Sequence, residues 1–374
     1  MNKPDPIDWS IAAKVASKIS GSDPFARSYH SDSLVADFAM LTPKAEALVS
    51  TSTGLIPDGQ ANARVVSRPE WINNNIRSFQ RMLKPITDRM GTDSGLWAPA
   101  ARAAAGVEVG TILGLLSKRV LGQYDMIGAG DEEKPQDEVA YVGPNVLAIE
   151  KKFAFPPEEF RLWLALHEVT HRAQFTGVPW MRGYFNTLTN RTLGSADPDP
   201  RRFLIALKRT VDAVRAGRNP FDDGGLVALL ADDDQLDALD KMGGLMSLLE
   251  GHGDITMDRA GTDHIPSAGR FSATLRQRRQ QSKPLIKLLQ QASGFEAKLR
   301  QYEEGERFIE GVESLRGMGF LDKVWLGSER LPSLVEIRDP NVWVARIDEI
   351  ETAFALTQRP IPRRARLFRR ALGT

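Results

Sequence analysis

The chain has 374 residues, of which 49 are basic and 48 acidic, so its net charge of +1 gives no overall field that would attract nucleic acid or an anionic membrane. The absence of cysteine excludes disulfides and thiolate metal sites, and it leaves histidine and carboxylate as the available metal ligands. The first residues lack the apolar core of a signal peptide, and we expect a cytoplasmic protein that does not enter a membrane.

Helical periodicity dominates the first third of the chain. Asp8 is a candidate N-cap for the first helix, which Gly21 should end. A later apolar helix carries Gly106, Gly110 and Gly114 at four-residue spacing; it is too short to cross a bilayer, and we expect it to be buried by close helix packing. The helices predicted in this region cover residues 8–19, 33–50, 70–90 and 106–116.

Two short apolar runs, residues 139–142 and 146–149, are the strand candidates of the chain. They lie on either side of the turn sequence Gly143-Pro144-Asn145 and follow a charged segment, residues 128–138, that should be a solvated loop. Pro156-Pro157-Glu158-Glu159 then predicts the start of a long helix, because proline and carboxylates are favoured in a first helical turn.

That helix contains His167-Glu168-Val169-Thr170-His171. Residues four apart share one face of a helix, so His167 and His171 can both direct a ring nitrogen at one metal ion. Glu168 is placed one position round from His167, near a water held by the metal and outside the ligand set, as a general base requires. Two of the five histidines lie here on a strongly periodic helix, which favours a zinc site over a chance match to a short motif.

A catalytic zinc site typically has three protein ligands, so one more ligand must come from another element. A helix that begins near residue 234 leads into Glu250-Gly251-His252-Gly253-Asp254. We predict Glu250 as the third ligand and Asp254, four residues on, as the partner of a ligand histidine's second ring nitrogen. His252 is the alternative third ligand, or otherwise a hydrogen-bond donor to the oxyanion that forms when water attacks a carbonyl. The two glycines indicate that another part of the chain approaches this helix closely, because glycine is costly in a helix interior.

Several stretches carry a resemblance to a known family, and they cover residues 8–9, 120–125, 142–145, 160–175, 179–180, 249–252 and 298–306. HExxH followed about eighty residues later by Glu-x-x-x-Asp resembles the gluzincin branch of the zincin metallopeptidases, of which thermolysin is the familiar member. The elongated metzincin pattern is absent, because Gln174 and Gly177 stand where it needs glycine and histidine. Over nearly its whole length the chain resembles an actinobacterial family of zinc-dependent metalloproteases described as associated with biosynthesis of the deazaflavin coenzyme.

The resemblance implies a mainly α, multi-helical zincin-like metallohydrolase with a small β element ahead of the HExxH helix. We therefore expect an N-terminal helical region of residues 1–127, a zincin-like metal-binding core of residues 139–330, and a C-terminal helix with a basic tail in residues 331–374, unless the three form one continuous domain. Further helices are predicted over residues 201–216, 267–291, 294–315 and 342–356.

We predict a zinc-dependent hydrolase, a metallopeptidase or amidohydrolase, in which Glu168 activates a zinc-bound water that attacks a peptide or amide carbonyl. Tyr124, Tyr302 and His252 are candidates for stabilising the oxyanion, although a buried core role explains each tyrosine more simply. The alternative function is that of a non-catalytic binding or scaffold protein with a structural zinc, which His252 would close as a fourth ligand.

The expected substrate is a peptide or a small amide. In zincins generally, an extended edge strand ahead of the metal helix can pair with a peptide, and Val146 to Glu150 occupies that place here. If that edge is covered, a small amide becomes the better candidate. Nucleic acid is a weak candidate: the arginines of the last sixteen residues form a solvated tail in the simplest interpretation, because Phe368 is the one aromatic residue among them. These arginines are Arg359, Arg363, Arg364, Arg366, Arg369 and Arg370.

Overall fold

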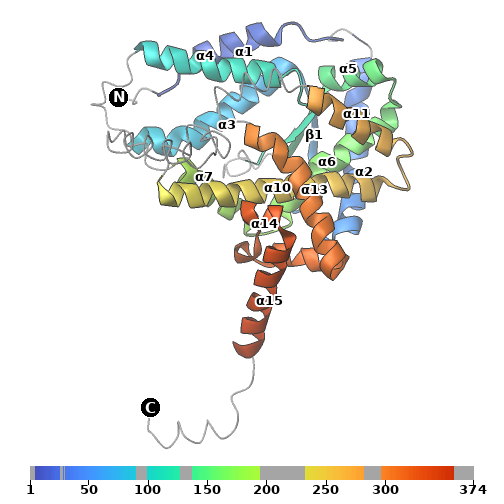
Figure 1. Cartoon of the computed structure of the whole chain (residues 1–374). Coiled ribbons are helices and arrows are strands. Elements are labelled where there is room, and N and C mark those ends of the chain that lie inside the picture. Colours follow the sequence, from blue (N-terminus) through green and yellow to red (C-terminus); the bar gives the residue numbers. More distant parts are fainter. Residues whose placement is uncertain are drawn as a thin grey trace, which may run out of the picture.

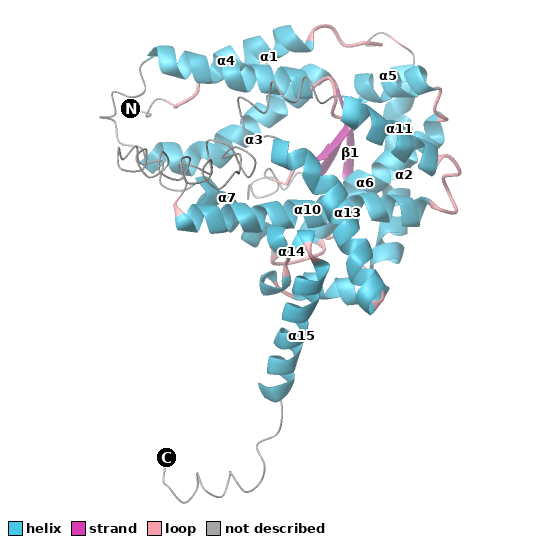
Figure 2. Cartoon of the chain, in the orientation of Figure 1, coloured by secondary structure: helices cyan, strands magenta, loops and turns pink. Residues whose placement is uncertain are grey.

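A computed structural model describes residues 5–25, 28, 30–89, 99–126, 137–193, 232–281 and 296–357. The fold is mainly α with one small sheet, as predicted (Figure 2). The α-helices are α1 (Trp9–Ser20), α2 (His30–Thr53), α3 (Arg68–Arg89), α4 (Pro99–Leu116), α5 (Gly143–Phe153), α6 (Pro157–Thr176), α7 (Met181–Leu193), α10 (Asp233–Gly261), α11 (Ala268–Gln281), α13 (Glu296–Arg316), α14 (Leu334–Arg338) and α15 (Pro340–Thr357). Two 3₁₀ segments, η2 (Met318–Leu326) and η3 (Ser328–Arg330), and the strands β1 (Asn62–Val66), β2 (Gly122–Tyr124) and β3 (Glu138–Val142) complete the described part.

Helices α1 and α4 lie against each other at one side of the molecule (Figure 1). Asp8 caps α1 as predicted, since its side chain accepts hydrogen bonds from two backbone N–H groups of the first turn. A methyl group on Gly110 would lie 2.5 Å from the Ala12 carbonyl oxygen, which confirms close packing along the glycine face. The prediction of a buried helix is correct for that face only, because Val107 on α4 is 47% exposed. Helix α4 begins at Pro99 and not at Gly106 as predicted, and by length and composition alone it is the one helix in the described ranges that could cross a membrane.

The sheet has the strand order β1-β3-β2, with β1 parallel and β2 antiparallel to the central β3. Strand β3 confirms one of the two strand predictions. The other was wrong, because residues 146–149 lie in α5 and so cannot offer a strand edge to a peptide. Pro144 is tolerated in the first turn of α5, and a short apolar run does not distinguish a buried strand from a buried helix. The edge strand next to the HExxH helix is β2.

Helix α6 lies at the centre of the largest hydrophobic core, between α2 and α10 (Figure 1). Helix α10 continues through both predicted glycines and ends at Gly261. Helix α13 crosses it where a methyl group on Gly251 would lie 2.4 Å from the Gly305 carbonyl carbon, so the predicted close approach is confirmed at this position. The same core draws side chains from Leu34 to Ile347, across both expected domain boundaries, and the three-part division stays a prediction.

Some predicted segments fall outside the described residues. The helix expected over residues 201–216 and the arginines of the C-terminal tail belong to this group, and the helix expected over residues 267–291 is described to Gln281 only. The backbone of Tyr302 belongs to α13, and its side chain is not among those described.

Candidate metal centre

Helix α6 brings the two motif histidines together at the edge of the core. It starts at Pro157 with two glutamates in its first turn, as predicted, and its apolar residues are buried on several sides. The Nε2 atoms of His167 and His171 lie 3.2 Å apart, with the rings nearly perpendicular to each other. The Nε2 atoms of the two imidazoles are therefore directed at one point in space.

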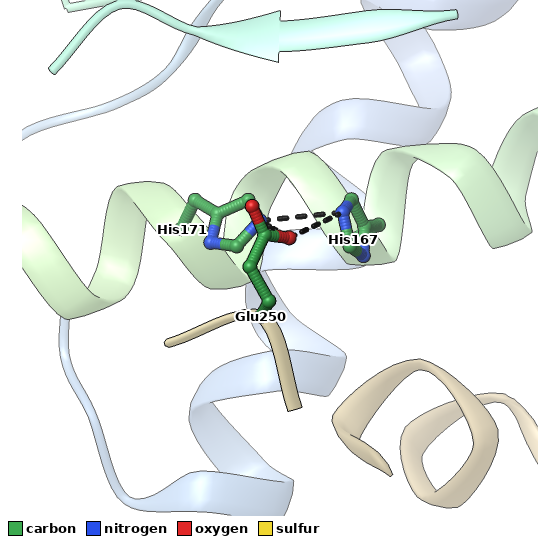
Figure 3. Close-up of side chains that lie close together, drawn as sticks. All are labelled: His167, His171 and Glu250. Carbon is green, nitrogen blue, oxygen red and sulfur yellow. Dashed lines mark hydrogen bonds and ion pairs between the residues drawn. The ribbon is translucent and has the colours of Figure 1, made fainter. Parts of the chain in front are cut away.

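Glu250 on α10 faces this point from the opposite side (Figure 3). Its Oε2 lies 3.5 Å from His171 Nε2 and 3.9 Å from His167 Nε2. Two ligands held tetrahedrally at zinc distances of about 2.1 Å lie roughly 3.4 Å apart, which is close to the three separations measured here. Among the described residues, His167, His171 and Glu250 form the one group of histidines and carboxylates with donor atoms near enough to hold a metal ion. Two imidazoles and one carboxylate are a donor set that suits zinc.

The other ring nitrogens of the two histidines face hydrogen-bonding groups. His167 Nδ1 lies 3.5 Å from Oδ1 of Asp254, the residue predicted as the partner of a ligand histidine. His171 Nδ1 lies 3.0 Å from Oε1 of Gln174, a fully buried residue one turn further along α6. Partners of this kind orient a ligand imidazole and keep its proton on the nitrogen that does not bind the metal.

His252 lies next to Gln174 and outside the group of three donor atoms. Its Nδ1 is 3.0 Å from Gln174 Nε2, and its ring packs edge-on against Trp325. Burial, together with the nearby charges of His171 and Arg259, lowers the pKa of His252 to about 3, so the ring is neutral at ordinary pH. A neutral ring at this position can accept a hydrogen bond at one nitrogen and donate one from the other.

The carboxylate of Glu168 is buried on the β2 side of α6. Burial raises the pKa of Glu168 to about 7; Glu250 adds to the rise, while His171 and the Tyr124 N–H, which donates to the carboxylate, oppose it. A group with a pKa near neutrality can both take and return a proton at working pH. Burial alone would lower the pKa of His171, but the hydrogen bond and charge of Glu250 raise it to about 9.

A cavity of about 160 Å³ opens beside these groups. Its wall combines the two histidines and both glutamates with strand β2 and a few apolar side chains, and His252 does not line it. Tyr124 does line it, but its hydroxyl accepts a hydrogen bond from Arg182 and lies close to Asp137. The lining residues are Gly122, Gln123, Tyr124, Met126, His167, Glu168, His171, Met246, Leu249 and Glu250.

The family model of the zincin-like metallopeptidases matches residues 7–344. The chain belongs to this family. A crystal structure of a Chloroflexus aurantiacus protein, described as "a putative hydrolase with a novel fold", has a TM-score of 0.66 to this chain and 28% sequence identity, with 91% of this chain and 99% of that chain covered. No curated protein matches the chain.

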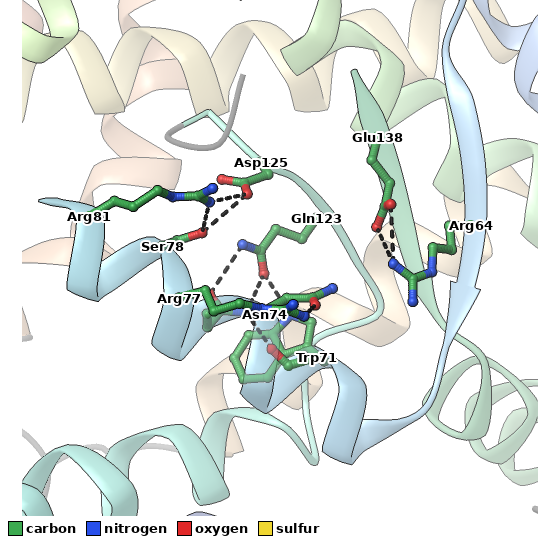
Figure 4. A network of polar contacts seen from close by, with 10 residues as sticks. Arg64, Trp71, Asn74, Arg77, Ser78, Arg81, Gln123, Asp125 and Glu138 are labelled. Atoms are coloured by element: carbon green, nitrogen blue, oxygen red, sulfur yellow. Dashed lines mark hydrogen bonds and ion pairs between the residues drawn. The ribbon is translucent and has the colours of Figure 1, made fainter. Parts of the chain in front are cut away.

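Side-chain hydrogen bonds anchor β2 and the residue that follows it to α3 (Figure 4). The Gln123 side chain accepts from Trp71 Nε1 at 2.6 Å and exchanges hydrogen bonds with Asn75. Asp125, directly after the strand, accepts from Ser78 Oγ at 3.1 Å. These bonds fix the strand that forms one wall of the cavity.

Two features of the site were missed in the sequence. Gln174 is three residues after His171, and this spacing places the two side chains on one helix face. The sequence prediction used Gln174 only to exclude the metzincin pattern. Strand β2 has three residues, too few for a periodic signal, although Gly122 within it marks a close approach.

Proposed function

We propose that this protein is a zinc-dependent hydrolase that cleaves a peptide or amide bond, with His167, His171 and Glu250 as the metal ligands. The observation that carries the proposal is the convergence of three donor atoms, from two helices, at separations of 3.2, 3.5 and 3.9 Å. Asp254 and Gln174 support it, because each faces the Nδ1 atom of one of the two histidines.

When bound, zinc polarises a carbonyl and lowers the pKa of water toward about 7. Glu168 is the general base: it takes a proton from the attacking water and returns it to the leaving nitrogen. The raised pKa and the place of this carboxylate in the cavity wall both suit that exchange. The Tyr124 N–H holds the carboxylate against β2 and so sets its position before substrate binds.

A catalytic role suits the site better than a purely structural one. Structural zinc sites are typically closed by four protein ligands, whereas this group has three donors and a cavity beside them. The fourth ligand of the alternative would be His252, which lies outside the group of donor atoms near enough to hold one metal ion. Whether His252 or Tyr302 stabilises an oxyanion stays a prediction.

The position of β2 at the edge of the sheet, in the wall of the cavity, supports a peptide-like substrate. Val142 donates to the Leu121 carbonyl, and bonding alternates along an antiparallel pair, so the backbone groups of Gly122 and Tyr124 point away from β3. Glu168 already accepts a hydrogen bond from the Tyr124 N–H, so an extended substrate would pair with the remaining backbone groups of this edge, next to the metal ligands. The resemblance to the family associated with deazaflavin biosynthesis does not identify a substrate, because that association rests on genomic context.

The test is a screen of peptide and small-amide libraries with the wild type and Glu168→Gln, both with matched zinc content. Glu168→Gln removes the base and no ligand, so it should keep its zinc and lose turnover. Equal turnover by the two proteins would contradict the proposed role of Glu168.

A further inference from the structure

The buried side chain of Gln174 connects three groups of the site. Its Oε1 lies 3.0 Å from His171 Nδ1, and its Nε2 lies 3.1 Å from the Leu249 carbonyl oxygen and 3.0 Å from His252 Nδ1. No part of Gln174 is exposed to solvent. A single amide therefore bridges the HExxH helix α6 and helix α10.

The chemistry of these partners leaves one orientation for the amide. The Leu249 carbonyl can only accept a hydrogen bond, so the group that faces it must be the NH₂ of Gln174. With the amide reversed, two carbonyl oxygens would face each other in a buried site, which is costly. The Oε1 atom consequently faces His171 and can only accept.

We propose that Gln174 is a positioning residue that sets the proton positions of both imidazoles. His171 must donate from Nδ1, which leaves the lone pair of its Nε2 directed at the metal. His252 must accept at Nδ1, so its single proton is on Nε2. The same NH₂ group holds the carbonyl of Leu249, the residue directly before Glu250, and so ties the position of the third ligand to the ring of His171.

The inference rests on the proposed function in one respect, since His171 is taken as a metal ligand. The first experiment does not depend on zinc: nitrogen-15 NMR of the full-length, metal-free protein, with the five histidines assigned, reports which ring nitrogen of His252 carries the proton. We expect the proton on Nε2 of His252. A proton on Nδ1 would overturn the inference and would leave the proposed function intact.

Two substitutions test the amide itself. Gln174→Met keeps the size of the side chain and removes all three hydrogen bonds, so zinc should bind roughly 10–100-fold more weakly, as when other groups that orient metal ligands are lost. Gln174→Glu keeps an acceptor for His171 but loses both donors, so the proton of His252 should move to Nδ1. Thr170→Val is the matched control: its hydroxyl is also buried on α6 but bonds to the Leu166 carbonyl, and its removal should leave zinc affinity and the tautomer of His252 unchanged.

The outcomes separate a positioning role from a merely structural one. Unchanged zinc affinity in Gln174→Met, or a His252 proton that stays on Nε2 in Gln174→Glu, would contradict the positioning role. A wild type that binds no zinc would contradict the proposed function. The tautomer of His252 would still test the orientation of the Gln174 amide in that case. If Gln174→Met does not fold, the wild-type spectrum and Gln174→Glu carry the test.

Discussion

A methyl group on Gly122 would lie 2.5 Å from Oε1 of Glu168, so strand β2 and the candidate base are in direct contact. Gly122→Ala should therefore push the carboxylate out of place without removing any metal ligand. We expect bound zinc to be retained and kcat/KM to fall by about 100-fold, the effect of displacing a reacting group by about 1 Å. Turnover and zinc content measured on the same samples check this.

Gly183→Ala provides the control for that substitution. Gly183 lies on α7, and a methyl group there would have no atom within 4 Å. Its activity should equal that of the wild type. Full activity of Gly122→Ala would show that Glu168 does not need its present position.

Zinc affinity should increase with pH up to about pH 9. In the metal-free protein the pKa of His171 is raised to about 9, so below that pH zinc must displace a proton from this ring. Affinity should then rise about tenfold for each pH unit while one proton is displaced. Calorimetric titrations in buffers of different ionisation enthalpy count the protons released. Release of no proton at neutral pH would mean that His171 is already neutral or is not a ligand.

The neutral state of His252 predicts that this residue lowers the stability of the fold in acid. Its pKa is about 3 in the folded protein against 6.5 for an ordinary histidine, so below about pH 6.5 the unfolded chain takes up a proton that the folded protein does not. The free energy of unfolding should fall by about 2 kcal/mol from this group by about pH 5. His252→Asn removes the titrating ring and keeps an acceptor for Gln174. Urea unfolding of both metal-free proteins across this range should give a smaller loss for the variant; parallel curves would contradict a neutral buried His252.

Two glycines on α10 should respond in opposite ways to alanine. At Gly251 the added methyl group would meet the Gly305 backbone at 2.4 Å, and we expect a loss of about 3 kcal/mol in the free energy of unfolding. At Gly253 the nearest atoms, in the rings of His167 and His171, are at an ordinary 3.4 Å, so the helix propensity of alanine should add up to about 1 kcal/mol. Denaturation of the two metal-free variants checks the contrast. A similar loss in both would mean that the glycines share one packing role.

The motif residues were predictable because their relationships are local. Spacing along one helix places His167 beside His171, and the same rule placed Glu250 and Asp254 on one face of α10. Gly251 signalled a close approach, but not that its partner would be Gly305 on α13. The contacts of Gln174 with Leu249 and His252, and of Gly122 with Glu168, join segments far apart in sequence, and periodicity within one element does not contain them. The helix at residues 146–149 was misassigned because four apolar residues fit either kind of buried element.

Zinc stoichiometry tests the central claim most directly. We would measure tightly bound zinc per chain in the wild type, Glu250→Gln and Glu168→Gln, with Asp234→Asn as a control that alters a carboxylate on α10 bonded to Arg191 at the surface. The wild type, Glu168→Gln and Asp234→Asn should each hold one zinc ion, and Glu250→Gln should bind it at least about 10-fold more weakly because a ligand is lost. A wild type without zinc, or a Glu250→Gln protein that binds zinc as tightly as the wild type, would contradict the assignment of His167, His171 and Glu250 as the metal ligands.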